Sequence, residues 1–458
     1  MKVSLKNKKV IIVEPAGTAA NVFSRYMNLP LMGTLYLGTI LRDAGFTVRI
    51  YNENFLLRSG GRDKYGITDK HLAGDFLLLS LITPAAERGY EIAKLFKITN
   101  PHGKVIIGGV HPTILPDEAL LNGADWVVQG EGEEVIVDLL KFGSSEKIIK
   151  TNFITDLNKT PIPDFKLLYK SESMDIYPII TSRGCPFNCN FCSVTKTFGH
   201  KYRTLDPDRV IYELKGVQKK QIFFYDDNFT ANKNRTKEIL KKIIDNKIKK
   251  IWTAQTRIDV AEDDELLSLM RKSGCIKIYI GLESINDQTL KEYKKAQTRD
   301  DIERGLTKIH NAGIDVHGMF IFGSDSDIPD VFNHTVKFCK KNKIETLQYL
   351  ALTPFPGTDL YIKMEQEGRL LHKNWRYYDA LHVVYRPRNI TSAELQRKII
   401  SSFESFYSFA HTISRAFAAA NGLTSSIETF FIRLFARHII YRWKKVNQGY
   451  MRFLLKDV

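Results

Sequence analysis

Cysteine is scarce in this chain, and the few cysteines are crowded together. Five occur in 458 residues, and Cys185, Cys189 and Cys192 lie within one eight-residue stretch. A disulfide scaffold would spread its cysteines along the chain, so this distribution excludes that class of protein and indicates a metal centre. Cys275 and Cys339 stand in apolar, periodic surroundings that are typical of core positions.

Long apolar runs are also missing. No stretch of about 18 apolar residues occurs, which argues against a membrane-spanning helix. The N-terminal segment 1–17 carries only a short apolar run, Val10–Val13, and this predicts a first β-strand instead of a signal peptide. We therefore expect a cytoplasmic protein.

Acidic residues are fewer than basic ones, 51 against 67, and the formal net charge is +16. This balance permits nucleic acid, an anionic lipid or an acidic substrate as a partner, and it equally fits lysines that are simply solvated. The basic residues are scattered and no RNA-binding motif accompanies them. A nucleic-acid partner is therefore not expected.

Short apolar runs alternate with amphipathic segments, which predicts an α/β protein of two or three domains. Residues 1–150 predict a doubly wound, Rossmann-like domain with strands at Val10–Val13, Thr47–Tyr51, Phe76–Leu81, Val105–Ile107 and Trp126–Val128. Residues 151–175 form a proline-containing linker. Residues 176–367 predict a partial (β/α)6 barrel with strands at Pro178–Thr181, Gln221–Tyr225, Lys250–Gln255, Ile276–Gly281, Val316–Phe322 and Thr346–Leu352. Both folds bind ligands at the carboxyl ends of their strands.

The crowded cysteines follow the first barrel strand directly, with the spacing C-x3-C-x2-C. Three thiolates on a [4Fe–4S] cluster leave one iron open, where the amino and carboxylate groups of S-adenosylmethionine (SAM) can chelate. An electron from the cluster can then break a C–S bond of the sulfonium. A structural zinc site is the alternative, and it would need a fourth ligand such as His200 or Cys275.

Several further motifs extend this pattern along the chain. They are F-Y-D-D-N-F at Phe224–Phe229, G-L-E-S at Gly281–Ser284, G-M-F-I-F-G-S-D at Gly318–Asp325, T-P-F-P-G-T at Thr353–Thr358, Gly108–Pro112 and Gly130–Glu133. Together with the cysteine motif, they resemble the radical SAM enzymes that carry an N-terminal cobalamin-binding domain. Members of that family include hopanoid C-methylases and the anaerobic magnesium-protoporphyrin ester cyclase. The resemblance covers nearly the whole chain.

The resemblance implies roles for residues at the strand ends of the barrel. Phe191 is expected near the SAM adenine, and Asp226 and Asp227 are expected to hold the SAM amino group or ribose. Glu283 is expected to hydrogen-bond SAM. The remaining SAM-binding positions are glycines that let the backbone approach the ligand, Gly318 and Gly323.

In the first domain the resemblance implies cobalamin. The expected contacts are small or polar residues at strand ends, namely Ser80, Thr83, Gly108, Gly109, Gly130 and Glu131. No G-x-G-x-x-G follows the first strand, which argues against a dinucleotide. The cobalt-ligating D-x-H-x-x-G motif is also absent, since the matching loop reads Glu14-Pro15-Ala16-Gly17-Thr18-Ala19. His111 lies on a different loop, and a degenerate domain that binds no cofactor is the alternative.

Residues 368–458 predict a mostly helical region rich in aromatic and basic residues. One helical stripe contains Ile432, Phe435, Ile439, Trp443, Val446 and Tyr450, and another face contains Arg433, Arg437 and Lys444. Such a helix either packs its stripe against the barrel or contacts the cytoplasmic face of an anionic membrane. The segment Arg376–Pro387 resembles hopanoid-modifying members, which would bring a lipid-like substrate.

These observations lead to three hypotheses. The first is a cobalamin-dependent radical SAM enzyme that forms a 5′-deoxyadenosyl radical and methylates an unactivated carbon of a hydrophobic, isoprenoid-like substrate. The second keeps the radical chemistry for cyclisation or oxidative rearrangement without methyl transfer. The third is a nucleic-acid-binding protein with a structural metal site. The first two need a reductant such as flavodoxin or ferredoxin.

Overall fold

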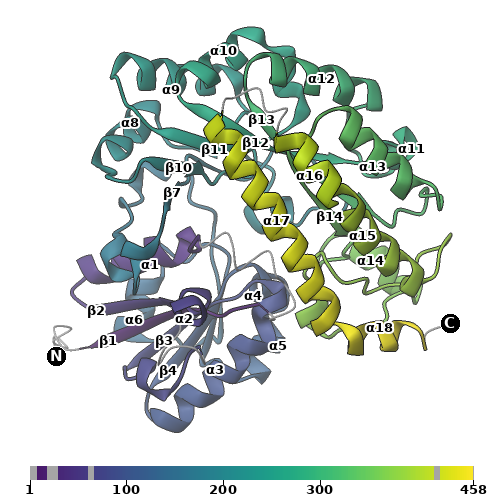
Figure 1. The fold of residues 1–458 in the computed structure, drawn as a ribbon. Helices are drawn as coiled ribbons and strands as arrows, with labels where there is room; N and C mark the ends of the chain where they lie inside the picture. Colours follow the sequence, from purple (N-terminus) through teal and green to yellow (C-terminus); the bar gives the residue numbers. More distant parts are fainter. Residues whose placement is uncertain (1–7, 18–28, 60–65, 417–422, 457–458) are drawn as a thin grey trace.

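The computed structural model describes residues 8–17, 29–59, 66–416 and 423–456. Two parallel sheets with flanking helices make up most of the molecule, and the C-terminal region lies against both (Figure 1). The predicted α/β architecture is therefore confirmed.

The first sheet contains six parallel strands in the order β2-β1-β3-β4-β5-β6. The strands are β1 Lys9–Glu14, β2 Thr47–Asn52, β3 Phe76–Ser80, β4 Lys104–Gly108, β5 Trp126–Gln129 and β6 Ile148–Lys150. The helices are α1 Met32–Asp43, α2 Glu53–Ser59, α3 Ala86–Thr99, α4 Val110–Ile114, α5 Pro116–Leu121 and α6 Ile136–Phe142. The strand order reverses between β1 and β3, and this topological switch is where such sheets bind ligands. The short edge strand β6 was not predicted.

The second sheet is also parallel, in the order β14-β13-β12-β11-β10-β7. Its strands are β7 Ile176–Ile179, β10 Gln221–Phe224, β11 Ile251–Thr256, β12 Cys275–Glu283, β13 Asp315–Phe322 and β14 Thr346–Ala351. Its main helices are α8 Pro207–Gly216, α9 Lys233–Asp245, α10 Asp264–Lys272, α12 Arg299–Asn311, α13 Val331–Lys341 and α14 Asp359–Gln366, with the short α7 Val194–Phe198 and α11 Asp287–Glu292. The end strands β7 and β14 do not pair among the described residues, so the sheet is an open, partial barrel.

The linker joins the two sheets through packing on both sides. Ile154 and Leu157 belong to the apolar core of the barrel. Leu168 belongs to the core of the first domain and forms a parallel bridge with Ile50. The first domain is therefore continuous with the barrel along this segment.

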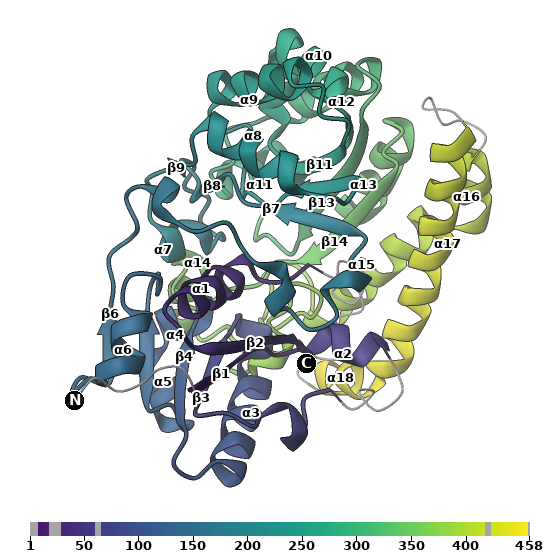
Figure 2. The same ribbon diagram turned by 90° about the vertical axis from the view of Figure 1, so that its left-hand side faces the viewer.

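The C-terminal region contains α15 Ser392–Phe406, α16 Phe409–Ala416, α17 Leu423–Val446 and α18 Gln448–Leu454. Figure 2 shows α16 and α17 as a layer along one side of the molecule. Within the described residues, no helix is both long and apolar enough to cross a membrane. Before α15, the segment around Trp375 and Tyr378 joins the core of the first domain instead of the barrel.

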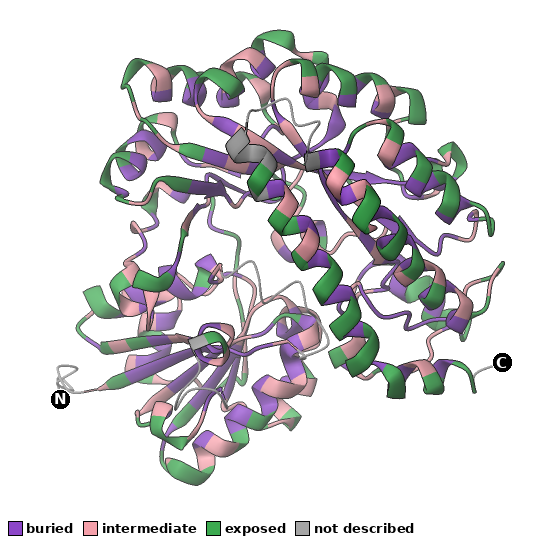
Figure 3. Cartoon of the chain, in the orientation of Figure 1, coloured by how far each residue is buried: buried purple, intermediate pink, exposed green. Residues whose placement is uncertain are grey.

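The apolar stripe of α17 and α18 is divided between packing and exposure (Figure 3). Ile439, Trp443 and Tyr450 are buried, whereas Val446 is exposed. The prediction for Arg433 was wrong, because this residue is fully buried and not on an outer basic face. Its guanidinium donates to the carbonyl oxygens of Glu345 and Phe406 at 2.8 and 2.7 Å, and the latter carbonyl lies at the end of α15, where backbone acceptors lack helical partners.

The division of the stripe makes a prediction about stability. Trp443 packs against Leu381 and Ile439, so Trp443→Ala should leave a cavity and lower the free energy of unfolding by about 3 to 5 kcal/mol. Phe431 on the same helix is 63% exposed, and Phe431→Ser should change that free energy by less than about 0.5 kcal/mol. Urea denaturation followed by circular dichroism compares the two variants, and equal stabilities would contradict this packing.

Candidate active site

The cysteine loop is closed at its base by two short antiparallel strands, β8 Ser182–Arg183 and β9 Arg203–Thr204. Cys185, Cys189 and Cys192 are half-buried free thiols in this loop. They line a cavity of about 200 Å³ at the carboxyl ends of the barrel strands, which we call the cluster cavity. The loop therefore presents its thiols where barrels of this kind bind ligands.

The thiol environment disfavours free thiolates and suits thiolates that are bound to a metal centre. Burial raises the pKa of Cys185 and raises that of Cys192 to about 12, so a thiolate here needs a compensating cation. Among the described residues, no three Cys, His, Asp or Glu side chains converge closely enough to hold one metal ion.

Three of the predicted SAM residues line the cluster cavity, namely Phe191, Asp227 and Glu283. Glu283 ends β12 with a left-handed φ of 60°, and its carboxylate accepts a hydrogen bond from Lys295 Nζ at 2.6 Å. The same carboxylate occupies the space that a Cβ at Gly281 would need. A side chain at position 281 would therefore displace the Glu283 carboxylate and the Lys295 ammonium from this arrangement.

Two other predicted residues do not face the cavity. The carboxylate of Asp226 has its partners within the protein, because it accepts hydrogen bonds from the backbone N–H groups of Thr181 and Ser182 at 2.6 and 2.9 Å. Gly318 packs toward Phe320 and Leu282. Successive side chains of a strand point to opposite faces, so a strand-end motif places only alternate residues in the site.

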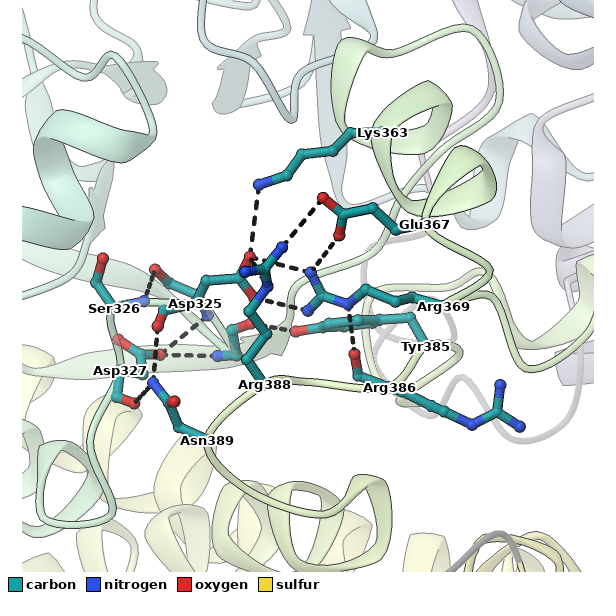
Figure 4. Close-up of polar contacts among 12 residues, drawn as sticks. Asp325, Ser326, Asp327, Lys363, Glu367, Arg369, Tyr385, Arg386, Arg388 and Asn389 are labelled. Carbon is teal, nitrogen blue, oxygen red and sulfur yellow. Dashed lines mark hydrogen bonds and ion pairs between the residues drawn. The ribbon is translucent and has the colours of Figure 1, made fainter.

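Gly323 also lies outside the cavity, in the loop that follows β13, and Figure 4 shows the contacts of Asp325 and Asp327 in the same loop. Its backbone N–H donates to Asp327 at 2.8 Å, and the Tyr385 hydroxyl donates to its carbonyl oxygen. The adjacent Asp325 accepts hydrogen bonds from both terminal nitrogens of Arg369 at 2.6 and 3.0 Å. This loop is therefore fastened to the C-terminal region, and the left-handed φ of 108° at Gly323 serves that turn.

Other residues of the cluster cavity were not predicted. Gln255, Arg257, Lys295 and Met319 line it, and the Arg257 guanidinium lies 3.9 Å from the centroid of the Phe187 ring. Gln255 ends a predicted strand, so its position offered a signal. Lys295 follows a helix, and nothing in the sequence around it indicated the site.

A second cavity, of about 300 Å³, lies where the carboxyl ends of the two sheets meet, and we call it the junction cavity. From the first domain it is lined by the predicted cobalamin contacts Ser80, Gly109, Gly130 and Glu131. From the barrel side it is lined by Ile180, Ser182, Arg183, Tyr225 and Asp227. It therefore occupies the topological switch point of the first sheet and faces the cysteine loop.

The remaining predicted cobalamin contacts lie elsewhere. Gly108 lines a smaller apolar cavity of about 60 Å³, which also contacts Ser80 and Gly109. Thr83 lines none of these three cavities, and its hydroxyl lies 3.4 Å from His111 Nδ1. His111 is buried between Thr83 and Glu118, so it does not face the junction cavity.

The wall of the junction cavity fits a large, flat ligand such as cobalamin. A Cβ built on Gly33 would have no atom within 4 Å, so its position opens into the cavity that it lines. Gly109 and Gly130 adopt φ values of 103° and 109°, which few other residues tolerate. Glycine backbone therefore forms part of this wall, which we call the glycine wall, beside side chains such as Leu37 and Ile82. Within the part of the chain that the structure describes, no histidine lines the cavity.

Asp227 lines both the cluster cavity and the junction cavity. Burial and the neighbouring Asp226 carboxylate raise its pKa to about 6. A group at the boundary of two ligand cavities with such a pKa is a strong functional candidate.

Comparisons with known proteins agree with this arrangement. Residues 179–339 match the model of the radical SAM superfamily, and residues 19–140 match that of the B12 binding domain. The bacteriochlorophyllide d C-12(1)-methyltransferase of Chlorobaculum tepidum is 30% identical over 410 residues, which cover 86% of each protein. The hopanoid C-2 methylase of Rhodopseudomonas palustris is 25% identical over 372 residues, covering 76% of this chain and 66% of that protein.

A solved structure has the same fold. The cobalamin-dependent S-adenosylmethionine radical enzyme OxsB with aqua-cobalamin bound superposes with a TM-score of 0.68 at 15% identity, covering 99% of this chain and 75% of that one. The chain belongs to the radical SAM enzymes that carry a B12-binding domain. Its cofactors are accordingly a [4Fe–4S] cluster, SAM and cobalamin.

The cysteine loop predicts a cluster that can be removed. Changing Cys185, Cys189 and Cys192 to Ala together should abolish the broad iron–sulfur absorption and the bound iron after anaerobic reconstitution. Cys275→Ala is the matched control, because this buried thiol lies at the opposite, amino end of β12. Equal iron content in the triple variant and the control would contradict the assignment.

The glycine wall predicts that cobalamin can be blocked without unfolding the protein. Gly33 lies in α1, so Gly33→Leu should keep the helix and fill the junction cavity. We expect cobalamin affinity to fall at least about tenfold, equivalent to about 1.4 kcal/mol. Retention of hydroxocobalamin through gel filtration measures this effect. Gly216→Leu, where a Cβ also meets no atom, is the control and should retain cobalamin normally.

Proposed function

We propose that this protein methylates an unactivated carbon of a hydrophobic substrate that binds between the cluster cavity and the junction cavity. The observation that carries this proposal is the shared wall at Asp227, since it brings the two cofactor sites next to each other. When bound, the cluster and SAM supply a 5′-deoxyadenosyl radical that removes a hydrogen atom, and cobalamin supplies the methyl group.

In this proposal the protein binds and orients the cofactors and shields the reacting carbon from water. Cys185, Cys189 and Cys192 hold the cluster, and Phe191 packs against the adenine of SAM. Asp227 accepts hydrogen bonds from the SAM ammonium. The glycine wall of the junction cavity holds the corrin face, and the apolar side chains around it exclude water from the reacting carbon.

The character of the cavity supports a hydrophobic substrate. Leu31, Leu37, Ile82 and Ile180 line the junction cavity, and Ile82 stays 39% exposed there. Several apolar side chains gathered around one cavity are typical of a site that binds an apolar ligand. The related enzymes named above act on a bacteriochlorophyllide and on hopanoids, both of which are largely apolar.

Isotope labelling tests the proposed reaction. The reconstituted protein is incubated anaerobically with reductant, deuteromethyl-SAM, and isoprenoid or tetrapyrrole extracts. A product that carries the deuterated methyl group supports methyl transfer. Products that change without gaining the label would support cyclisation or rearrangement instead. A flavodoxin or ferredoxin is proposed as the physiological reductant, and each can replace the chemical one in this assay.

Peripheral membrane contact through α17 is a further part of the proposal. Phe431 and Tyr441 are 63% and 66% exposed on this helix, and the neighbouring Arg437 and Arg442 are exposed too. Apolar and basic side chains on one surface favour anionic headgroups. Flotation with anionic vesicles should carry the wild-type protein and fail for Phe431→Ser, and a wild-type protein that does not float would remove the membrane from the proposal.

The raised pKa of Asp227 predicts the pH dependence of SAM binding. Above about pH 6 the carboxylate is ionised and pairs with the SAM ammonium, and below that pH it gains a proton and the affinity falls. Asp227→Asn should bind SAM about tenfold more weakly, since it loses a charge-assisted hydrogen bond, and its affinity should not change between about pH 5 and 7. Equilibrium dialysis with labelled SAM measures both, with the exposed Asp208→Asn as control. An unchanged acid limb in Asp227→Asn would contradict this role.

A further inference from the structure

Four buried charged residues join the first domain to the barrel. Glu131 and Glu133 lie in the loop after β5, and Arg183 and Arg203 lie on β8 and β9. Their side chains are 5%, 8%, 9% and 2% exposed, respectively. We call these residues the arginine–glutamate cluster.

The contacts within the cluster are short and cross-linked. The two terminal nitrogens of Arg203 donate to the two carboxylate oxygens of Glu131 at 2.7 and 2.8 Å. Arg183 donates to Glu133 at 2.7 Å and lies 3.2 Å from Glu131. The carboxylate of Glu131 is therefore bound by two arginines of the barrel, although the sequence had suggested this residue as a cobalamin contact.

The linker adds two hydrogen bonds to the same cluster. The backbone N–H of Ile154 donates to Glu131 at 2.7 Å, and its carbonyl oxygen accepts from Arg203 at 2.7 Å. The Arg183 guanidinium also lies 5.1 Å from the centroid of the Tyr36 ring on α1. The first domain, the linker and the barrel are thus bonded to one another at the arginine–glutamate cluster.

The arginine–glutamate cluster lies between the cysteine loop and the loop that lines the junction cavity. Arg183 and Arg203 are register partners at the base of the cysteine loop, and Cys185 follows Arg183 by two residues. Glu131 and Glu133 alternate with Gly130 and Gly132, whose backbone lines the junction cavity. The base of the loop that carries the thiols is therefore bonded directly to the loop that forms the cobalamin wall.

Charge balance keeps this geometry rigid. Burying four charges is costly, and the cost is offset only when each charge keeps its partners in good geometry. Burial alone would raise the pKa of Glu131, but the Arg203 hydrogen bond and the Arg183 charge hold it below its usual range. A two-pronged guanidinium–carboxylate contact also fixes direction as well as distance. The two loops cannot move relative to each other without breaking it.

We propose that the arginine–glutamate cluster is the positioning element that sets the distance and orientation between the cobalamin wall and the cluster cavity. Glu131, Glu133, Arg183 and Arg203 are positioning residues, because they act through the two loops and not on the reacting atoms. The inference rests on the proposed function, since it needs both cofactors bound at these sites.

The test measures the spacing of the two cofactors by electron paramagnetic resonance. The full-length protein is loaded with cluster and cobalamin and reduced, so that both the cluster and cob(II)alamin are paramagnetic. Fast relaxation of the cob(II)alamin signal then reports the nearby cluster, because this dipolar effect falls steeply with distance. The readout does not depend on turnover or on the identity of the substrate.

Three variants separate positioning from stability. Glu131→Gln leaves Arg203 without its carboxylate, and Arg183→Lys keeps the charge but loses the fork-shaped donor. Glu345→Gln is the matched control, because Glu345 pairs with Arg415 at 2.9 Å, is equally buried, and lies just before β14, at the opposite end of the barrel from the cavities. All three should lower thermal stability.

The expected result is a several-fold loss of the relaxation enhancement in Glu131→Gln, a smaller loss in Arg183→Lys, and none in Glu345→Gln. If Glu131→Gln does not fold, Arg183→Lys decides the question alone. A normal relaxation enhancement in Glu131→Gln and Arg183→Lys, with both cofactors bound, would overturn the positioning role of the arginine–glutamate cluster. The proposed function would not be affected by that result. A wild-type protein that retains no cobalamin would overturn the proposed function and this inference with it.

Discussion

The shared direction of the strands within each sheet is the constraint on which the rest of this structure depends. Every pairing in the two large sheets is parallel, so each sheet gathers all its strand carboxyl ends along one edge. The structure sets these two edges opposite each other, and the junction cavity is lined by residues that follow strands of both. Small residues such as Ser80 and Gly109 stand at one edge, and the acidic Asp227 stands at the other. The location of the site is thus a consequence of strand direction before any side chain is considered.

Facing edges must also be held together, and polar contacts add to the apolar packing of the linker and of the segment around Trp375. The arginine–glutamate cluster holds the side nearest the cysteine loop. On the other side, the indole N–H of Trp375 donates to Glu118 at 2.9 Å, and Arg376 pairs with Glu87. The C-terminal region therefore contacts both the barrel and the first domain and connects them. Its buried Arg433 and its fastening of the loop at Gly323 fit the same role.

Burial also raises the pKa of acidic groups at the strand ends of the first domain and in the cluster cavity. Desolvation raises the pKa of Glu14 to about 7, even though it accepts hydrogen bonds from Leu31 N–H at 3.0 Å and Asn52 Nδ2 at 2.6 Å. It raises the pKa of Asp227 and of the thiols Cys185 and Cys192 in the same way. The cluster cavity, which Asp227, Cys185 and Cys192 line, therefore favours bound cations, and SAM and the iron–sulfur core both bring positive charge. The electrostatics of the pocket and its cofactors are therefore complementary.

The sequence by itself determined the two parallel sheets, the cysteine loop and its chemistry, and four residues of the first-domain wall, namely Ser80, Gly109, Gly130 and Glu131. Those features depend on local pattern: buried parallel strands are continuously apolar, and three thiols at C-x3-C-x2-C spacing lie on one loop wherever it folds. Tertiary structure alone decided which strand-end residues face the cavities. Asp227 lines both cavities, whereas the carboxylate of Asp226 is held by the backbone N–H groups of Thr181 and Ser182. It also decided the partners of Glu131, Arg203 and Arg433, since a long charged side chain can face water or a buried partner, and only the packing of distant segments settles which.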